Sequence, residues 1–174
     1  MPETIILRAT EKDYKPIVRI GRISVREAHG ESCSAEDMNE YLDNNYNDDA
    51  IKEELKNTKN IYHIIKSDET AAGFSKIVLD AEHPGIPQKN VTKLDRIYLL
   101  KDFYNLKLGL KLLNFNIDLA KANNQSGIWL FTWVGNKRAV NFYLKTGFLI
   151  IGNHNFKVTE THYNENHLMF LNLC

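Results

Sequence analysis

The sequence contains little cysteine and no long apolar run. Cys33 and Cys174 are the two cysteines in 174 residues, too few for the disulfide framework of a secreted scaffold. No apolar run approaches the ~20 residues that a membrane-spanning helix needs. The first fifteen residues also lack the basic segment and apolar stretch of a signal peptide. These absences predict a cytoplasmic protein without a membrane segment.

Length and composition are those of one ordinary globular domain. A chain of 174 residues that is 43% hydrophobic buries about two thirds of its unfolded surface without disulfides or a metal. The sequence shows no internal repeat, low-complexity tract or linker. Residues 1–174 are therefore predicted to form a single domain.

The net charge is zero, but the charges are unevenly divided. Residues 1–85 carry 17 acidic and 11 basic side chains, whereas residues 86–174 carry 5 acidic and 11 basic ones. Solvated helix faces explain most asymmetries of this kind. The alternative is that the second half binds an anionic ligand and the first half a cationic one.

Hydrophobic periodicity predicts an α/β fold, a mixed sheet with helices on its faces. Thr10 with Asp13, Ser34 and Asn136 are expected to begin helices, and Gly147 to end one. The segment SDET is a hairpin signal, and HPGIPQKN is expected to be a surface loop. The expected strands are 4–9, 61–65, 71–79, 94–99, 128–134, 148–158 and 166–174, and the expected helices are 14–28, 34–46, 50–56, 107–123 and 136–147.

The stretch KLDRIYLLKDFYNLKLGLKLL, residues 93–113, joins a predicted strand directly to a predicted helix. Such a junction gathers unpaired backbone N–H groups and the positive end of the helix dipole at one point. Anions bind at such helix starts, so an anion site is expected near Lys107.

Four segments together resemble a known family. LDRIYLL, FYNLKLG, LFTWV and above all Asn136-x-x-Ala139-x-x-Phe142-Tyr143-x-x-x-Gly147-Phe148 are similar to the motifs of the GNAT superfamily of acetyl-CoA-dependent N-acetyltransferases. The resemblance covers roughly residues 93–150 in order and spacing. Within the superfamily, RIYLLKDFYNLKLG is most similar to bacterial spermidine/spermine acetyltransferases.

This resemblance implies a fold, a reaction and a set of site residues. The implied fold has a mixed, mostly antiparallel sheet that splays between its fourth and fifth strands. The implied reaction passes the acetyl group of acetyl-CoA directly to a primary amine of a small molecule or peptide, without a metal. The residues implied to bind the coenzyme are Ile97, Tyr98, Leu99, Tyr104, Asn105, Leu106, Lys107, Leu108, Gly109, Leu110, Asn136 and Tyr143.

The anion-binding turn departs from the family pattern. That pattern is Gln/Arg-x-x-Gly-x-Gly/Ala, in which Tyr104 takes the first position, Lys107 the first glycine and Gly109 the last. Only Gly109 keeps the family residue. The N–H groups of residues 106–110 and the charge of Lys107 are expected to hold the pyrophosphate instead.

Two catalytic roles are assigned from the resemblance. Tyr143 takes the place of the tyrosine that protonates the leaving thiolate, although a helix tyrosine that merely packs is the alternative. Asp95 is the candidate general base, and strand alternation is expected to place it on the face of Ile97 and Leu99. That Asp95 is a surface partner of Arg96 or Lys93 is an equal alternative, and Tyr98, His63 or a water chain are the other candidate bases.

The acceptor is predicted from the acidic segment between Glu27 and Glu54. The resemblance implies that this helical section lines the acceptor side, and a negative field attracts polyamines such as spermidine or a basic N-terminus. Its acidic residues are Glu27, Glu31, Glu36, Asp37, Glu40, Asp43, Asp48, Asp49, Glu53 and Glu54.

Other classes of function fit the sequence less well. A non-catalytic acyl-CoA sensor of the same fold is one alternative, because the turn has lost glycines. A nucleic-acid module is another, but most aromatic residues fall on elements that are expected to be buried. His162 and His167 lack further ligands at metal spacing. By analogy with the family, the terminal strands are a candidate homodimer interface.

Overall fold

The computed structural model describes residues 2–174. The elements are β1 (Thr4–Arg8), η1 (Glu11–Asp13), α1 (Tyr14–His29), α2 (Ala35–Asn45), α3 (Asp48–Lys56), β2 (Ile61–Ser67), β3 (Thr70–Val78), β4 (Val91–Leu99), η2 (Lys101–Leu106), α4 (Leu108–Ala122), β5 (Gly127–Trp133), α5 (Lys137–Lys145), β6 (Leu149–Lys157) and β7 (Tyr163–Asn172). Every expected helix and strand is confirmed, with small shifts at the ends. The short 3₁₀ helices η1 and η2 were not expected.

The predicted helix caps are confirmed. Asp13 Oδ2 accepts hydrogen bonds from the backbone N–H and the hydroxyl of Thr10. Ser34 accepts a hydrogen bond from the backbone N–H of Asp37, and Asn136 accepts one from that of Ala139. These side chains satisfy N–H groups that a helix start leaves unpaired.

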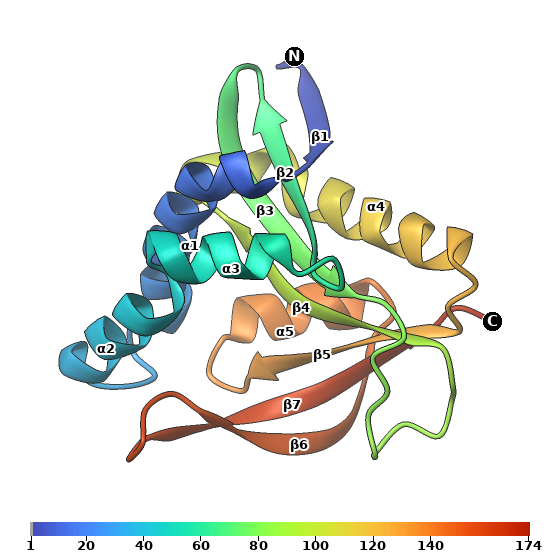
Figure 1. The fold of residues 1–174 in the computed structure, drawn as a ribbon. Helices are drawn as coiled ribbons and strands as arrows, with labels where there is room; N and C mark the ends of the chain where they lie inside the picture. Colours follow the sequence, from blue (N-terminus) through green and yellow to red (C-terminus); the bar gives the residue numbers. More distant parts are fainter. Residues whose placement is uncertain (1) are drawn as a thin grey trace.

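Seven strands form one mixed sheet in the order β1-β2-β3-β4-β5-β7-β6 (Figure 1). β4 and β5 are parallel, and every other neighbouring pair is antiparallel. The predicted mixed, mostly antiparallel sheet is confirmed.

β4 and β5 separate soon after they meet. Their paired residues are Val91–Gly127, Thr92–Ile128 and Lys93–Trp129, and no pairing follows along either strand. The side of β4 that faces β5 therefore presents backbone groups without a strand partner from about Leu94 onward. The predicted splay between the fourth and fifth strands is confirmed.

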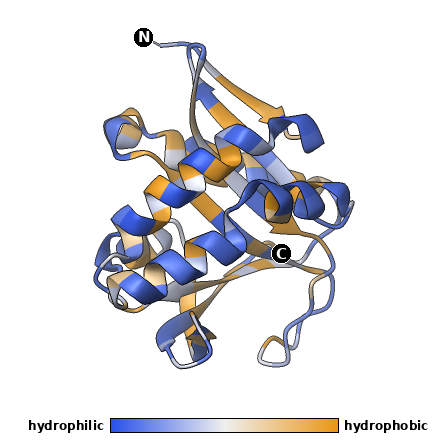
Figure 2. Cartoon of the chain, turned by 60° about the vertical axis from the view of Figure 1, so that its left-hand side comes forward, coloured by the Kyte–Doolittle hydropathy of each residue, from blue (hydrophilic) through white to orange (hydrophobic). Residues whose placement is uncertain are grey.

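Helices cover both faces of the sheet. On one face, here called the α1 face, Ile17, Leu42 and Ile51 pack on Tyr62 and Phe74. On the other, the α4 face, α4 and α5 pack on β3, β4 and β5 in two apolar clusters. Figure 1 shows α1–α3 and α4 on opposite sides of the strands. In Figure 2, the helices carry both hydrophilic and hydrophobic residues, whereas the central strands are largely hydrophobic.

The sheet ends in strand β6, whose outer edge is apolar. Leu149, Ile150 and Ile151 are exposed there, which leaves an unpaired hydrophobic edge of the kind that native sheets usually protect. In residues 2–174, no helix is long and apolar enough to span a membrane.

Candidate functional site

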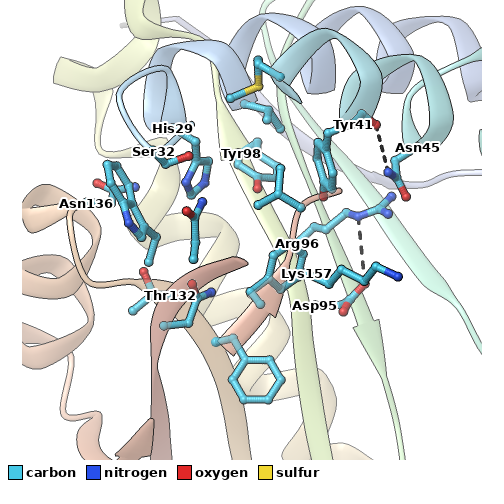
Figure 3. Close-up of a pocket in the computed structure, with 18 of the residues that line it drawn as sticks. His29, Ser32, Tyr41, Asn45, Asp95, Arg96, Tyr98, Thr132, Asn136 and Lys157 are labelled. Carbon is cyan, nitrogen blue, oxygen red and sulfur yellow. Dashed lines mark hydrogen bonds and ion pairs between the residues drawn. The ribbon is translucent and has the colours of Figure 1, made fainter. Parts of the chain in front are cut away.

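A cavity of about 440 Å³ opens where β4 and β5 separate. It is lined from the α1 face by α1, α2 and the β6–β7 end of the sheet, and it reaches Ala139 and Tyr143 of α5 through the gap. In Figure 3, Tyr98 lies between His29 and Tyr41, and Arg96 and Asp95 lie below them. The cavity thus connects the two faces of the sheet.

A β-bulge decides where Asp95 points. Lys76 and Ile77 of β3 are consecutive, but they pair with Arg96 and Leu94, so Asp95 is an extra residue in β4. A bulge interrupts strand alternation. The side chain of Asp95 contacts cations on the α1 face, whereas Ile97 and Leu99 pack under α4. The expectation that Asp95 shares their face is wrong.

Five charged side chains form a mostly buried network beside the cavity. Lys76 Nζ lies 2.8 Å from Glu54 Oε2 and 3.0 Å from Asp95 Oδ2. Lys93 Nζ lies 2.7 Å from Asp95 Oδ1, and Arg96 Nη2 lies 3.0 Å from Glu54 Oε1. Tyr62 donates its hydroxyl hydrogen bond to Glu54. Asp95 is thus a partner of Lys93, as the alternative interpretation expected, with Lys76 as an unforeseen second partner.

The network keeps both carboxylates ionised. Burial by itself raises the pKa of Asp95, but Lys76, Lys93 and Arg96 outweigh burial and lower that pKa to about 2. In the same way, Arg96 and Lys76 overcome the effect of burial and lower the pKa of Glu54. Opposite charges at hydrogen-bond distance favour the ionised form.

Tyr143 lies on the wall of the cavity, on α5. Its side chain is buried against the rings of Phe142 and Phe148. Its hydroxyl has no hydrogen bond to another residue within 2–174. Burial raises its pKa, so the phenol stays protonated around neutral pH and is available as a hydrogen-bond donor.

The other two candidate bases differ in position. Tyr98 lines the cavity, and burial raises its pKa, so it holds its proton at neutral pH. His63 lies on β2 against Phe115 of α4 and outside the cavity lining. Burial, with the nearby charge of Arg8, lowers the pKa of His63 to about 4.

The expected anion site lies at the start of α4. Lys107 adopts a left-handed conformation with φ +56°, and the helix follows at once. The first helical hydrogen bond runs from Lys111 N–H to Lys107 C=O. The N–H groups of residues 108–110 therefore have no acceptor within the helix and can bind an anion. Tyr104 packs beneath the guanidinium of Arg138, which lies 3.2 Å from its ring centroid. Gly109 contacts Leu99 so closely that an added Cβ would lie 3.0 Å from it.

Sequence reasoning did not single out three residues of the cavity. His29 contacts Tyr98 and Trp133, and burial lowers its pKa to about 4. Asn166 is buried, and its side-chain oxygen has no hydrogen-bond partner. Lys93 was considered only as a partner of Asp95. A histidine at a helix end or an asparagine in a strand carries no sequence signal of a role in a site, because the cavity is formed by segments that are distant in the sequence.

The described residues, 2–174, contain no group of three or more His, Cys, Asp or Glu side chains placed to hold a metal ion.

Comparisons with known proteins agree with the fold and extend it to a family. Residues 20–148 match the model of the acetyltransferase (GNAT) family. An uncharacterized N-acetyltransferase in the pepI 3′ region of Lactobacillus delbrueckii subsp. lactis is 29% identical over 151 residues, which are 87% of each chain.

Two solved structures illustrate the shared fold. The PaiA N-acetyltransferase of Thermoplasma acidophilum in complex with coenzyme A has a TM-score of 0.78 and 17% identity, covering 98% of this chain and 99% of that one. A GNAT-family acetyltransferase of Streptococcus pneumoniae has a TM-score of 0.66 and 22% identity, covering 98% and 100%.

Proposed function

The chain belongs to the acetyltransferase (GNAT) family, and from this premise we propose that it transfers the acetyl group of acetyl-CoA directly to a primary amine. The observation that carries the proposal is the cavity that crosses the sheet at the gap between β4 and β5. A thioester can approach this cavity from the α4 face and an amine can approach it from the α1 face, so the two can meet there.

The chemistry needs a neutral amine and a stabilised leaving group. The amine nitrogen attacks the thioester carbonyl carbon, the C–S bond breaks, and an amide and a thiol form. The amine nitrogen loses two protons to water, one before the attack and one after it, and the sulfur gains one. The phenol of Tyr143 lines the cavity and remains protonated, so it supplies the proton or a hydrogen bond to the sulfur, and water returns any proton that it gives.

The coenzyme would be held mainly by backbone groups. The β5-facing edge of Ile97 to Leu99 has no strand partner, so pantetheine can add to it as an extra strand. A backbone N–H on the same edge would polarise the thioester carbonyl. The start of α4, with Lys107 beside it, would bind the pyrophosphate. The Thermoplasma relative was solved with coenzyme A, which supports this use of the fold.

Replacing Lys107 by glycine should separate backbone strain from charge. Lys107→Gly relieves the left-handed conformation, so the free energy of unfolding should rise by about 1 kcal/mol. It also removes one positive charge from the anion site, so acetyl-CoA should bind about threefold to tenfold more weakly. Chemical denaturation and titration calorimetry measure the two effects.

Lys107→Ala is the matched control, because it removes the same charge but keeps a Cβ at positive φ. It should weaken acetyl-CoA binding as much as Lys107→Gly does, without the gain in stability. Unchanged coenzyme affinity in both variants would exclude Lys107 from the anion site.

We propose that water accepts the amine proton. Asp95 as the general base stays a prediction, but a carboxylate with a pKa of about 2 is a weak acceptor for a proton from an ammonium ion. His29 is limited in the same way, since its pKa is about 4. Its neutral imidazole can still accept a hydrogen bond.

A polyamine acceptor also stays a prediction. Of the ten acidic residues that suggested it, Glu40 alone lines the cavity. Asp43 and Glu53 pair with Arg22 and Lys56, and Glu54 belongs to the buried network. A long-range field from the outer helices remains available to attract cations, and raising ionic strength would weaken it.

Two measurements on the purified protein test the proposed function. Titration calorimetry should detect acetyl-CoA binding, and a thiol-release assay with polyamines, amino acids and short peptides should show turnover with at least one amine. Binding without thiol release for any amine would identify a sensor of the same fold. Absence of binding would overturn the proposal.

A further inference from the structure

The buried network beside the cavity carries one positive charge in excess. Lys76, Lys93 and Arg96 face two carboxylates, Glu54 and Asp95, whose four oxygens all contact a cation. The side chains of Lys76 and Arg96 are each only 11% exposed, and that of Lys93 is 29% exposed. Water therefore screens the charges of Lys76 and Arg96 poorly and that of Lys93 in part.

The remaining carboxylates of the cavity wall do not neutralise the excess. Glu160 pairs with Lys157 at 2.7 Å. Glu40 on α2 is exposed at the edge of the cavity and has no ion-pair partner within residues 2–174. Because Glu40 is exposed to water, its charge acts weakly on the ion-pair network. The part of the cavity wall at Lys93 is therefore suited to an anion.

Lys93 is the cation of this network whose N–H donors are only partly used. An ammonium group has three N–H donors, and Asp95 is the acceptor at hydrogen-bond distance from Lys93 Nζ. The rings of Trp129 and Phe131 lie 5.3 and 5.7 Å from this nitrogen and keep it beside the cavity wall. Two donors therefore remain for a ligand.

The rest of the cavity offers an aromatic surface and an acceptor for an N–H donor. The aromatic part of the wall, which also carries many polar side chains, includes Tyr41, Tyr98, Phe131, Trp133 and Phe156. Asn166 supplies a buried oxygen that lacks a hydrogen-bond partner. A buried acceptor without a donor is costly, and an amine N–H would satisfy it.

From these observations we infer that the acceptor is an amine that also carries an anionic group, held by Lys93 beside the ion-pair network. This inference rests on the proposed acetyl transfer and names its substrate class. Asp95, which contacts Lys93, and the unpaired edge at Ile97 are separated by one residue of the bulged strand β4. A carboxylate several bonds from the amine, as in a short peptide with an aromatic side chain, fits this separation.

A matched pair of substrates tests the inference on the unmodified protein. Phenylalanylglycine and its C-terminal amide differ in one negative charge and have nearly the same amine basicity. In the thiol-release assay, kcat/KM for the acid should exceed that for the amide about tenfold, as one hydrogen bond to a charged group predicts. Spermidine should be a poorer acceptor than the acid.

Variants of Lys93 locate the preference. Lys93→Met should reduce the acid-to-amide ratio to below about threefold, and Lys93→Arg should retain it. Lys121→Met removes an exposed lysine of α4 and should leave the ratio unchanged. If Lys93→Met does not fold, the substrate pair on the unmodified protein still decides.

Two results would overturn the inference while acetyl transfer stands. One is an acid-to-amide ratio below about fivefold on the unmodified protein. The other is a higher kcat/KM for spermidine than for the acid. If no amine releases thiol, the proposed function itself fails, which is a distinct result.

Discussion

Replacing Tyr143 by phenylalanine should lower kcat about 100-fold and change acetyl-CoA affinity less than threefold. General acid catalysis contributes about 10²–10⁴-fold, and the lower end applies because a thiolate, whose thiol has a pKa of about 8.5, is already a good leaving group. Binding should be preserved because the ring that packs on Phe142 and Phe148 remains. Single-turnover rates and calorimetric titrations measure the two quantities.

The stability of Tyr143→Phe shows whether a lower kcat results from partial unfolding. The Tyr143 hydroxyl has no hydrogen bond to another residue in 2–174, so Tyr143→Phe should keep its free energy of unfolding within about 1 kcal/mol. Tyr163→Phe, at an exposed tyrosine of β7, is the matched control and should keep full activity. Equal kcat in Tyr143→Phe and the unmodified protein would remove the phenol from the mechanism.

The fold could be predicted from sequence because its signals are local. Period-two and helical patterns give the strands and helices, and the caps at Thr10, Ser34 and Asn136 use side chains within three residues of the groups they satisfy. The motif from Asn136 to Phe148 carries the family resemblance for the same reason. Such features do not depend on how distant segments meet.

The acceptor side could not be predicted because its determinants are not local. The bulge at Asp95 depends on pairing with β3, and alternation along β4 alone gives the opposite face. The acidic residues between Glu27 and Glu54 are close in the sequence but lie apart in the structure. Glu54, for example, is part of a mostly buried network and binds Arg96 and Lys76. The cationic excess at Lys93 exists only once β3, β4 and α3 have assembled.

Replacing Asp95 by asparagine should distinguish a general base from a member of the ion-pair network. In the network role, the change leaves Lys76, Lys93 and Arg96 facing Glu54 alone. The free energy of unfolding at pH 7 should then fall by about 3 kcal/mol, the lower end for breaking a mostly buried ion pair. At saturating acceptor, kcat of the folded variant should fall less than tenfold. In the base role, kcat should fall at least about 100-fold.

The pH dependence of stability gives an independent check on the same variant. The pKa of Asp95 is lowered from 3.8 to about 2 in the folded chain, so its contribution is fully present above about pH 5 and is lost as pH falls through 2. The stability difference between the unmodified protein and Asp95→Asn should therefore be constant from pH 5 to 7 and shrink below pH 4.

Asp49→Asn is the control, because the side chain of Asp49 is 96% exposed. This change should lower the free energy of unfolding by less than about 0.5 kcal/mol. A constant difference down to pH 2 would contradict the network role, because it would mean that the carboxylate of Asp95 is not stabilised by its cations.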